Sequence, residues 1–147
     1  MMDEKKRMDE FMTQCRERHV RVTPQRVEIF RQLSRCAEHP AAETLYERVR
    51  ETMPAISLDT VYRTLSLLEA KHLVCTVGTV DGRTRYDATT ALHYHFICDR
   101  CRSVSDIFRG EDDTFDPSIV AAGMGDVDAV NIQLRGTCRN CLDRASA

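Results

Sequence analysis

Apolar residues recur at helical spacing in three stretches of the first half of the chain, after a polar opening segment that extends to about His19. The first of these helices is expected to begin at Thr23-Pro24, because threonine is a common N-cap and proline suits the first helical position. The second is expected to begin near His39-Pro40 and to end before Pro54. The third is expected to begin at Ser57, which would cap it.

The third helix has a clear division between an apolar and a polar face. Its apolar positions are Leu58, Val61, Leu65 and Leu68. The side chains expected on the outer face are Asp59, Thr60, Arg63, Thr64 and Ser66.

The hydrophobic period changes to two after this helix, which predicts β-strands. Residues 73–80 and 83–87 flank Asp81-Gly82, a strong signal for a hairpin turn. Helices followed by a hairpin are the pattern of a winged helix. Small, weakly patterned residues at 88–92 indicate a linker. We therefore expect an α+β protein with a winged-helix DNA-binding domain at 1–88 and a small α/β domain at 89–147.

The second domain shows three further strand patterns, at 92–97, 103–108 and 129–135. In the last of these, Val130, Ile132 and Leu134 alternate with polar residues. Between the second and third strands, residues 112–123 are expected to form one short helix that Pro117 breaks early.

Composition and charge are those of an ordinary globular protein. The chain has 147 residues, of which 42% are hydrophobic and 30% charged, with a formal net charge of −2. Residues 1–88 carry 15 basic and 14 acidic side chains, whereas residues 89–147 carry 6 and 9. A nucleic acid would therefore bind the first domain. The sequence has no long apolar run and no apolar core of a signal peptide, so we expect a cytoplasmic protein that does not enter a membrane.

Four of the seven cysteines form two CxxC pairs, Cys98/Cys101 and Cys138/Cys141, separated by 36 residues. Four thiolates in a tetrahedron are typical of a structural zinc ion, which would tie the first strand of the second domain to its last segment. Thiol–disulfide chemistry is the alternative. Cys15, Cys36 and Cys75 belong to no pair and are interpreted as ordinary buried or half-buried thiols.

A second candidate site contains only nitrogen and oxygen donors. His93 and His95 lie two apart on a predicted strand, so both imidazoles point to one face, and Asp106 lies on an otherwise apolar face of the next strand. His39 and Asp87 could complete a five-ligand set suited to Fe(II), Mn(II), Co(II) or Zn(II). Each of these residues also has a purely structural alternative. The His93/His95 pair could lie at the surface, His39 could be a helix N-terminal residue, and Asp87 could cap the end of a strand. His19 and His72 are expected at the surface.

The chain as a whole resembles the ferric uptake regulator family of metal-dependent repressors. The matching segments are Arg21–Arg26, His39–Tyr46, Ile56–Leu65, Arg85–Asp87, His93–Cys101 and the closing Cys138/Cys141 pair. The resemblance implies a homodimer with an N-terminal winged helix and a C-terminal dimerisation domain. It also implies one structural Zn2+ per chain on four cysteines, and a regulatory Fe2+ or Mn2+, replaceable by Zn2+ in vitro, at the domain junction on His39, Asp87, His93, His95 and Asp106.

Aspartate at both 87 and 106 resembles the peroxide-responsive branch of the family, in which a histidine ligand is oxidised; His39 and His93 match that role. The zinc-uptake branch typically has cysteine in place of Asp87. The iron-uptake branch often has a further site, which Leu92, Tyr94 and Val130 would not form. Tyr62-Arg63, however, resembles the iron-uptake form. We therefore expect a peroxide-responsive repressor, with an iron-responsive repressor of iron-uptake genes as the alternative.

DNA recognition is expected from the third helix, in which Arg63 can donate two hydrogen bonds to a guanine and Tyr62 can contact a phosphate or a thymine methyl group. Thr60 and Thr64 would be adjacent contacts. Basic residues are expected to follow the DNA backbone: Arg21, Arg26, Lys5, Lys6 and Arg7. A two-fold dimer would bind a pseudo-palindromic operator in double-stranded DNA. Asp59 departs from this picture, because a carboxylate there would repel phosphate.

Two other classes of function are compatible with parts of the sequence. A mononuclear iron enzyme uses similar ligands, but the sequence shows no substrate-binding signature, so we expect no enzyme. The other is a protein-interaction module held together by zinc, without DNA binding. Metal-dependent binding to a specific DNA sequence would exclude both.

Overall fold

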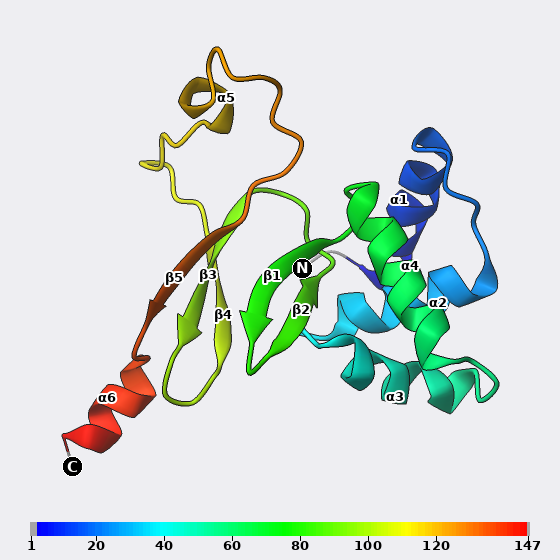
Figure 1. Cartoon of the computed structure of the whole chain (residues 1–147), viewed down its shortest axis with the longest axis horizontal. Coiled ribbons are helices and arrows are strands. Elements are labelled where there is room, and N and C mark those ends of the chain that lie inside the picture. Colours follow the sequence, from blue (N-terminus) through cyan, green and yellow to red (C-terminus); the bar gives the residue numbers. More distant parts are fainter. Residues whose placement is uncertain (1–2, 147) are drawn as a thin grey trace. The chain divides into compact units, whose positions relative to one another are not determined.

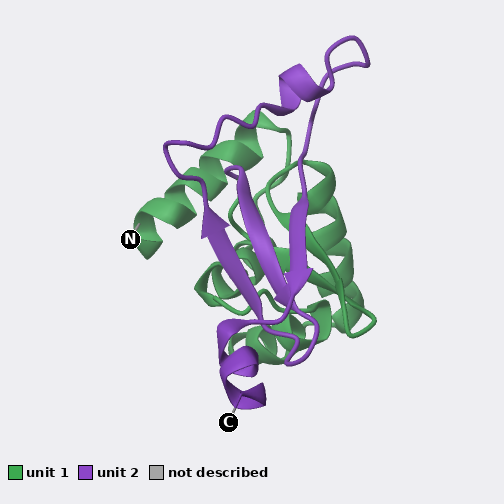
Figure 2. Ribbon diagram, turned by 90° about the vertical axis from the view of Figure 1, so that its left-hand side faces the viewer, with its two compact units in different colours: residues 1–90 green, residues 91–147 purple. Residues whose placement is uncertain are grey.

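The computed structural model describes residues 3–146 and divides the chain into two compact units, Met1–Thr90 and Ala91–Ala147, which we call unit 1 and unit 2 (Figures 1 and 2). Unit 1 contains four helices and a hairpin, and unit 2 contains a three-stranded sheet with two short helices. This arrangement confirms the expected α+β class. Among the described residues, no helix combines the length and the apolar character needed to cross a membrane.

The helices of unit 1 are α1 (Glu4–Glu17), α2 (Pro24–Arg35), α3 (Ala42–Thr52) and α4 (Leu58–Ala70). The two predicted caps are confirmed, because Thr23 accepts a hydrogen bond from the Arg26 amide at 3.2 Å and Ser57 accepts one from the Thr60 amide at 3.1 Å. The predicted start of the second helix is wrong, since α3 begins at Ala42. His39 has φ +53° and precedes a proline, and both features keep it out of a right-handed helix.

The core of unit 1 is built from the apolar faces of the four helices. Phe11 of α1 stacks on Phe30 of α2, with ring centroids 3.9 Å apart. The fully buried residues of α3 and α4 are Leu45, Val49, Val61, Leu65 and Leu68. Arg18, at the end of α1, donates to the carbonyls of Lys71 and His72 just after α4, which joins the first and last helices.

Thr64 corrects the predicted division of α4 into faces. It was expected on the outer face, but it is only 6% exposed. The reason is helical geometry: Thr64 lies three residues after Val61 and four before Leu68, so it falls within the buried stripe.

The wing of unit 1 is the hairpin of β1 (Cys75–Val80) and β2 (Arg83–Asp87). Its turn residues Asp81 and Gly82 have φ +53° and +74°, as the primed hairpin turns require, so the predicted turn is confirmed. An isolated bridge between Ala41 and Arg85 attaches the wing to the loop before α3.

Unit 2 is organised around β3 (His93–Cys98), the central strand of its sheet. It pairs antiparallel with β4 (Val104–Phe108) and parallel with β5 (Ile132–Gly136). Two short helices, α5 (Pro117–Val120) and α6 (Arg139–Ala145), complete the unit.

Two sequence expectations for unit 2 need correction, and one helix of this unit was not expected. The helix expected over 112–123 is a single turn, because the Asp113 carboxylate accepts from the Phe115 amide and keeps the preceding chain turned, and Pro117 fits only at a helix start. The last strand begins at Ile132 rather than at residue 129. Helix α6 was not predicted; it has too few apolar residues for a periodic signal.

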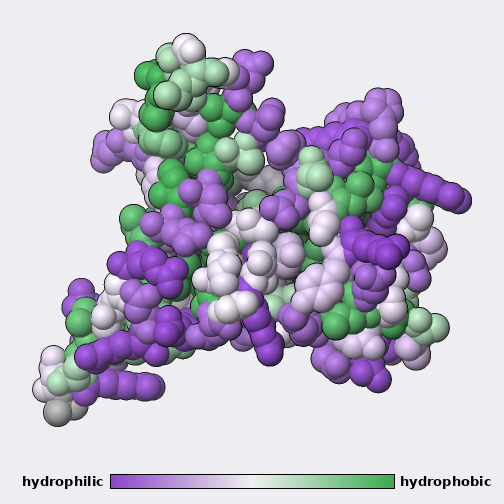
Figure 3. Space-filling model, in the orientation of Figure 1, coloured by the Kyte–Doolittle hydropathy of each residue, from purple (hydrophilic) through white to green (hydrophobic). Residues whose placement is uncertain are grey.

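Unit 2 carries large apolar side chains on its surface. Ile119 and Val120 of α5 are 72% and 69% exposed, and Met124 just after α5 is 89% exposed. Figure 3 shows this apolar surface around α5. Phe108, Leu134 and Leu142 are also exposed.

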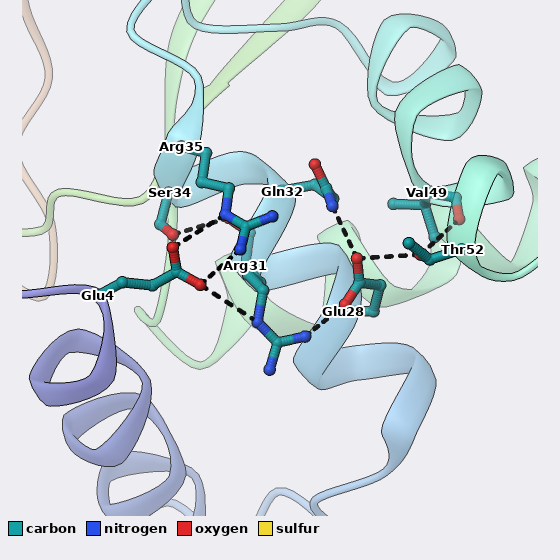
Figure 4. A network of polar contacts seen from close by, with 8 residues as sticks. All are labelled: Glu4, Glu28, Arg31, Gln32, Ser34, Arg35, Val49 and Thr52. Atoms are coloured by element: carbon teal, nitrogen blue, oxygen red, sulfur yellow. Dashed lines mark hydrogen bonds and ion pairs between the residues drawn. The ribbon is translucent and has the colours of Figure 1, made fainter.

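A buried carboxylate, Glu28 of α2, links α2 to α3 (Figure 4). It accepts hydrogen bonds from Gln32 at 2.7 Å and from Thr52 of α3 at 3.0 Å, and it pairs with Arg31. Glu4 of α1 in turn pairs with Arg31 and receives two hydrogen bonds from Arg35. Three helices are therefore joined by one polar network.

Burial raises the pKa of Glu28, but the hydrogen bonds from Gln32, Thr52 and Arg31 outweigh it and leave the pKa below its usual value of 4.5. A carboxyl group whose pKa is lowered by folding stabilises the native state above its unfolded pKa. That contribution is lost as the pH falls through the lower, folded value.

We predict that Glu28→Ala lowers the free energy of unfolding by about 1–3 kcal/mol at pH 7, because three donors lose their acceptor. Urea denaturation followed by circular dichroism measures this change. The difference from wild type should shrink between pH 7 and pH 3. Glu47→Ala is the matched control, since Glu47 is an exposed acid whose Arg50 partner lies 3.5 Å away. Equal losses in the two variants would contradict a special role for Glu28.

Candidate metal centres and DNA-binding surface

Four cysteine sulfurs converge at one end of the sheet in unit 2. The parallel pairing of β3 with β5 places Cys98 opposite Gly136, which brings the segment that carries Cys138 and Cys141 beside the first CxxC pair. The Cys98–Cys141 and Cys101–Cys138 sulfur distances are 3.9 and 3.8 Å, and all four sulfurs lie within 4.8 Å of one another.

These distances match the ligand set of a tetrahedral metal ion. Zinc–sulfur bonds of about 2.3 Å give sulfur–sulfur separations of about 3.8 Å in a tetrahedron, whereas a disulfide bond measures about 2.05 Å. None of the seven cysteines forms a disulfide bond, and Cys15 and Cys36 are buried in unit 1. Half-buried Cys75 contacts the Thr89 carbonyl.

The surroundings of the four thiols shift their pKa values in different directions. The amides of Cys101 and Cys138 donate to the Cys98 sulfur at 3.5 and 3.3 Å and lower the pKa of Cys98 to about 6. The neighbouring thiols, Cys138 first, together with burial raise the pKa of Cys141 to about 12. The Ser103 hydroxyl, 3.0 Å from the Cys101 sulfur, lowers the pKa of Cys101. A metal ion bound by these thiols would displace their protons, so its affinity would rise with pH.

A second cluster in unit 2 contains two imidazoles and a carboxylate. The antiparallel register places His95 directly opposite Asp106, and His93 lies on the same face. The Nε2 atoms of His93 and His95 are 3.0 Å apart, and they lie 3.6 and 3.4 Å from Asp106 Oδ1. The structure thus brings together the three candidate ligands predicted in this unit.

The ring of His93 is oriented by the backbone. Its Nδ1 lies 2.7 Å from the Ala91 carbonyl oxygen, which only accepts hydrogen bonds, so Nδ1 carries the proton and Nε2 offers a lone pair. A cation near the three side chains can satisfy the ring nitrogens and the carboxylate together. The donor set is free of sulfur and suits iron or manganese as well as zinc.

Unit 1 holds the other two candidate ligands close to each other. His39 Nδ1 lies 3.6 Å from Asp87 Oδ2, and both side chains are buried. The Thr89 amide donates to Asp87 Oδ1 at 2.8 Å, which fixes one carboxylate oxygen. His39 is thus in the loop before α3 and not in a helical first turn.

Arg85 was missed by the sequence analysis. Its guanidinium donates to the backbone carbonyls of Glu38 and His39, and the neighbouring Tyr86 amide donates to the Pro40 carbonyl at 3.1 Å. These bonds hold the His39 loop against the strand that ends in Asp87. The only signal in the sequence is that Arg85 precedes Asp87 by two residues, which by itself does not point to a loop 46 residues away.

Helix α4 presents most of the side chains expected to contact DNA. Arg63 is exposed, with its Nε 2.9 Å from Asp59 Oδ2, and Tyr62 is 40% exposed and donates to Glu43 of α3. Thr60 is half-buried, and the buried Thr64 is unsuited to a base contact.

The basic residues expected along the DNA backbone differ in their surroundings. Arg21 is exposed, and half-buried Arg26 donates to the Arg21 carbonyl at 2.8 Å. Lys5 and Lys6 of α1 are exposed, whereas Arg7 donates to the Ser34 carbonyl.

Comparison with known proteins gives a consistent result. The model of the ferric uptake regulator family matches residues 17–134. The peroxide-responsive repressor PerR of Staphylococcus aureus is 30% identical over 139 residues, 93% of each chain. A structure of a zinc uptake regulator complexed with zinc and DNA covers both chains completely, with a TM-score of 0.70 and 28% identity. The ferric uptake regulator of Pseudomonas aeruginosa with manganese gives a TM-score of 0.70 and 26% identity over 86% of this chain and 96% of that one.

The family model spans most of the chain, including the helices of the winged helix after α1, the imidazole–carboxylate cluster and the first CxxC pair. Its members regulate transcription and are not enzymes, which removes the iron-enzyme alternative. The chain therefore belongs to the ferric uptake regulator family, as a metal-responsive DNA-binding transcriptional regulator.

Proposed function

We propose that this regulator is a metal-dependent repressor that responds to peroxide through oxidation at a regulatory Fe(II)/Mn(II) site. The observation that carries the proposal is the sulfur-free cluster of His93, His95 and Asp106 in unit 2. Asp106 of this cluster and Asp87 of unit 1 are both aspartates, as in the peroxide-responsive branch of the family. The 30% identity with the S. aureus peroxide-responsive repressor supports the same branch.

The regulatory ligands are proposed to be His39 and Asp87 from unit 1 with His93, His95 and Asp106 from unit 2. One metal ion can bind all five ligands only in one relative orientation of the two units. Metal binding therefore selects that orientation. If DNA binds that orientation better, the affinity for DNA rises with the fraction of protein that has metal bound. Iron held by these ligands would supply the redox chemistry that splits the O–O bond of peroxide. Peroxide is the oxidant: one of its oxygen atoms would be added to the imidazole of His39 or His93, and the other would leave as water.

The DNA-binding surface is proposed to be α4, with Arg63 and Tyr62 as base contacts and Thr60 beside them. Arg21, Arg26 and the lysines of α1 would add contacts to phosphate that weaken with salt. Two copies of α4 in a two-fold dimer would bind a pseudo-palindromic operator.

An iron-responsive repressor is the second candidate, and one observation favours it: Tyr62 and Arg63, the pair typical of the iron-uptake branch, are both exposed on α4. Such a protein would bind the operator according to free Fe(II) and would keep its histidines unmodified.

The decisive experiment loads the protein with Fe(II) or Mn(II) and adds micromolar peroxide while DNA binding is followed. We expect one added oxygen atom on His39 or His93 in the iron form alone, with release of DNA. Intact mass and peptide mapping measure the modification. The exposed His19 and His72 are internal controls and should stay unmodified. Unmodified His39 and His93 with DNA binding that tracks Fe(II) would make the protein an iron-level regulator.

We further propose that Cys98, Cys101, Cys138 and Cys141 hold one structural Zn2+ per chain. The support is the near-tetrahedral spacing of their sulfurs. The ion would join the end of β3 to the start of α6, a helix in which Cys141 is the one buried residue among those described.

We predict that Cys138→Ser lowers the zinc content from about one ion per chain to none and lowers the melting temperature of unit 2. Elemental analysis and thermal denaturation measure the two changes. Cys75→Ser is the matched control, because this thiol lies outside the cluster and serine can still donate to the Thr89 carbonyl. Full zinc content in Cys138→Ser would exclude the four-thiolate site.

A homodimer through unit 2 is proposed from its exposed apolar side chains and from β5, an edge strand of the sheet. A second copy of the chain is the partner that covers such a surface in this family.

We expect the double substitution Ile119→Glu and Val120→Glu to shift the protein from dimer to monomer, because two charges would be buried at the interface. Size-exclusion chromatography with light scattering gives the mass. Ser118→Glu, at an exposed polar position of the same helix, should remain dimeric. A dimeric double variant would place the interface elsewhere.

A further inference from the structure

The proposed DNA-binding surface contains an acidic residue that the function so far leaves unexplained. Asp59 lies in the first turn of α4, and its Oδ2 is 2.9 Å from the Nε of Arg63, one helical turn later. The two side chains are 68% and 81% exposed. The residue proposed to contact a guanine is therefore held by a carboxylate before any DNA is present.

Stability of the helix is a weak reason for this pair. Exposed ion pairs at this spacing on a helix typically contribute less than about 0.5 kcal/mol. A carboxylate at the helix N-terminus is favoured by the helix dipole, but many exposed first-turn positions would provide that benefit at a greater distance from DNA. On a surface that approaches phosphate, the negative charge of Asp59 weakens binding to every duplex.

The geometry of the pair suits a positioning role. A guanidinium has five N–H donors, and Asp59 Oδ2 forms an ion pair with Arg63 on the side of Nε. The two terminal nitrogens then remain as a fork, and this is the edge that donates to O6 and N7 of guanine. A fixed fork also loses less side-chain entropy when it binds than a freely rotating arginine does.

The second base-contacting side chain is held in a similar way. The hydroxyl of Tyr62 donates to Glu43 of α3, which lowers the pKa of that carboxyl. Glu43 thus accepts a hydrogen bond from Tyr62, and Asp59 forms an ion pair with Arg63, the two side chains of α4 proposed to contact bases. An arrangement with negative charge beside both contacts lowers affinity for random DNA more than for a sequence that uses the fork.

We propose that Asp59 is a specificity-determining positioning residue: it holds the Arg63 fork for one guanine in each half-site and lowers affinity for other duplexes. The inference rests on the proposed function, since it takes α4 as the DNA-binding helix. Asp59 itself makes no base contact in this scheme.

The test uses the 147-residue chain loaded with Mn(II) and a pool of duplexes with a random central 30 base pairs. Selection with the wild-type chain defines the bound sequence. Affinities are then measured for that duplex, for copies changed at single base pairs and for an unselected duplex, at one fixed salt concentration. The variants are Asp59→Asn, Arg63→Ala and the double variant. Glu51→Gln, which removes one exposed negative charge of α3, controls for charge alone.

Discrimination at a base pair is the ratio of the affinities for the selected duplex and for the copy changed at that base pair. We expect Arg63→Ala to lose discrimination at one guanine per half-site. Asp59→Asn should lose about twofold in discrimination at the same guanine and bind the unselected duplex about twofold more tightly. In the Arg63→Ala background, Asp59→Asn should not reduce discrimination further. Glu51→Gln should discriminate as wild type does.

Wild-type discrimination in Asp59→Asn would overturn the proposal. So would an effect of Asp59→Asn on discrimination that persists without Arg63, because Asp59 would then contact a base directly. Loss of discrimination at a base pair that Arg63→Ala leaves unchanged would also overturn it. Failure of the wild-type protein to select any sequence is a different result, because it would contradict the proposed DNA-binding function itself.

Discussion

The removal of ionisable side chains from water is the constraint on which both units depend. His93 and His95 are buried in unit 2, and His39 and Asp87 are buried in unit 1. Such groups are costly to bury unless hydrogen bonds, opposite charges or a metal ion compensate them. The register of β3 with β4, the hairpin and the loop before α3 bring these groups within reach of one another inside each unit.

Features governed by local chemistry could be predicted from the sequence. The caps at Thr23 and Ser57 and the Asp81-Gly82 turn each depend on a few neighbouring residues, so their residue types were sufficient. The common face of His93 and His95 follows from the two-residue period of a strand. The CxxC spacing likewise indicated ligands, although only the parallel β3–β5 pairing explains how the two pairs meet.

Features governed by distant contacts could not be predicted. The start of α3 depends on the left-handed backbone of His39, which is held from the wing by Arg85. The burial of Thr64 reflects how the apolar stripe of α4 fits the other helices, and a hydroxyl gives no hydrophobic signal for it. Helix α6 follows directly from Cys138, so it is fixed by a cluster whose other half lies about 40 residues earlier.

The bonds from Arg85 to the loop of His39 have a further consequence. Arg85 belongs to the wing. Its bonds therefore join the loop that carries His39 to the strand that ends in Asp87, so the two proposed ligands move together. A duplex that restrains the wing then also restrains these ligands. By thermodynamic reciprocity, any gain in DNA affinity that an ion produces is matched by an equal gain in ion affinity produced by DNA. In the proposed mechanism, the protein bound to its operator thus has a higher affinity for the ion than the protein free in solution.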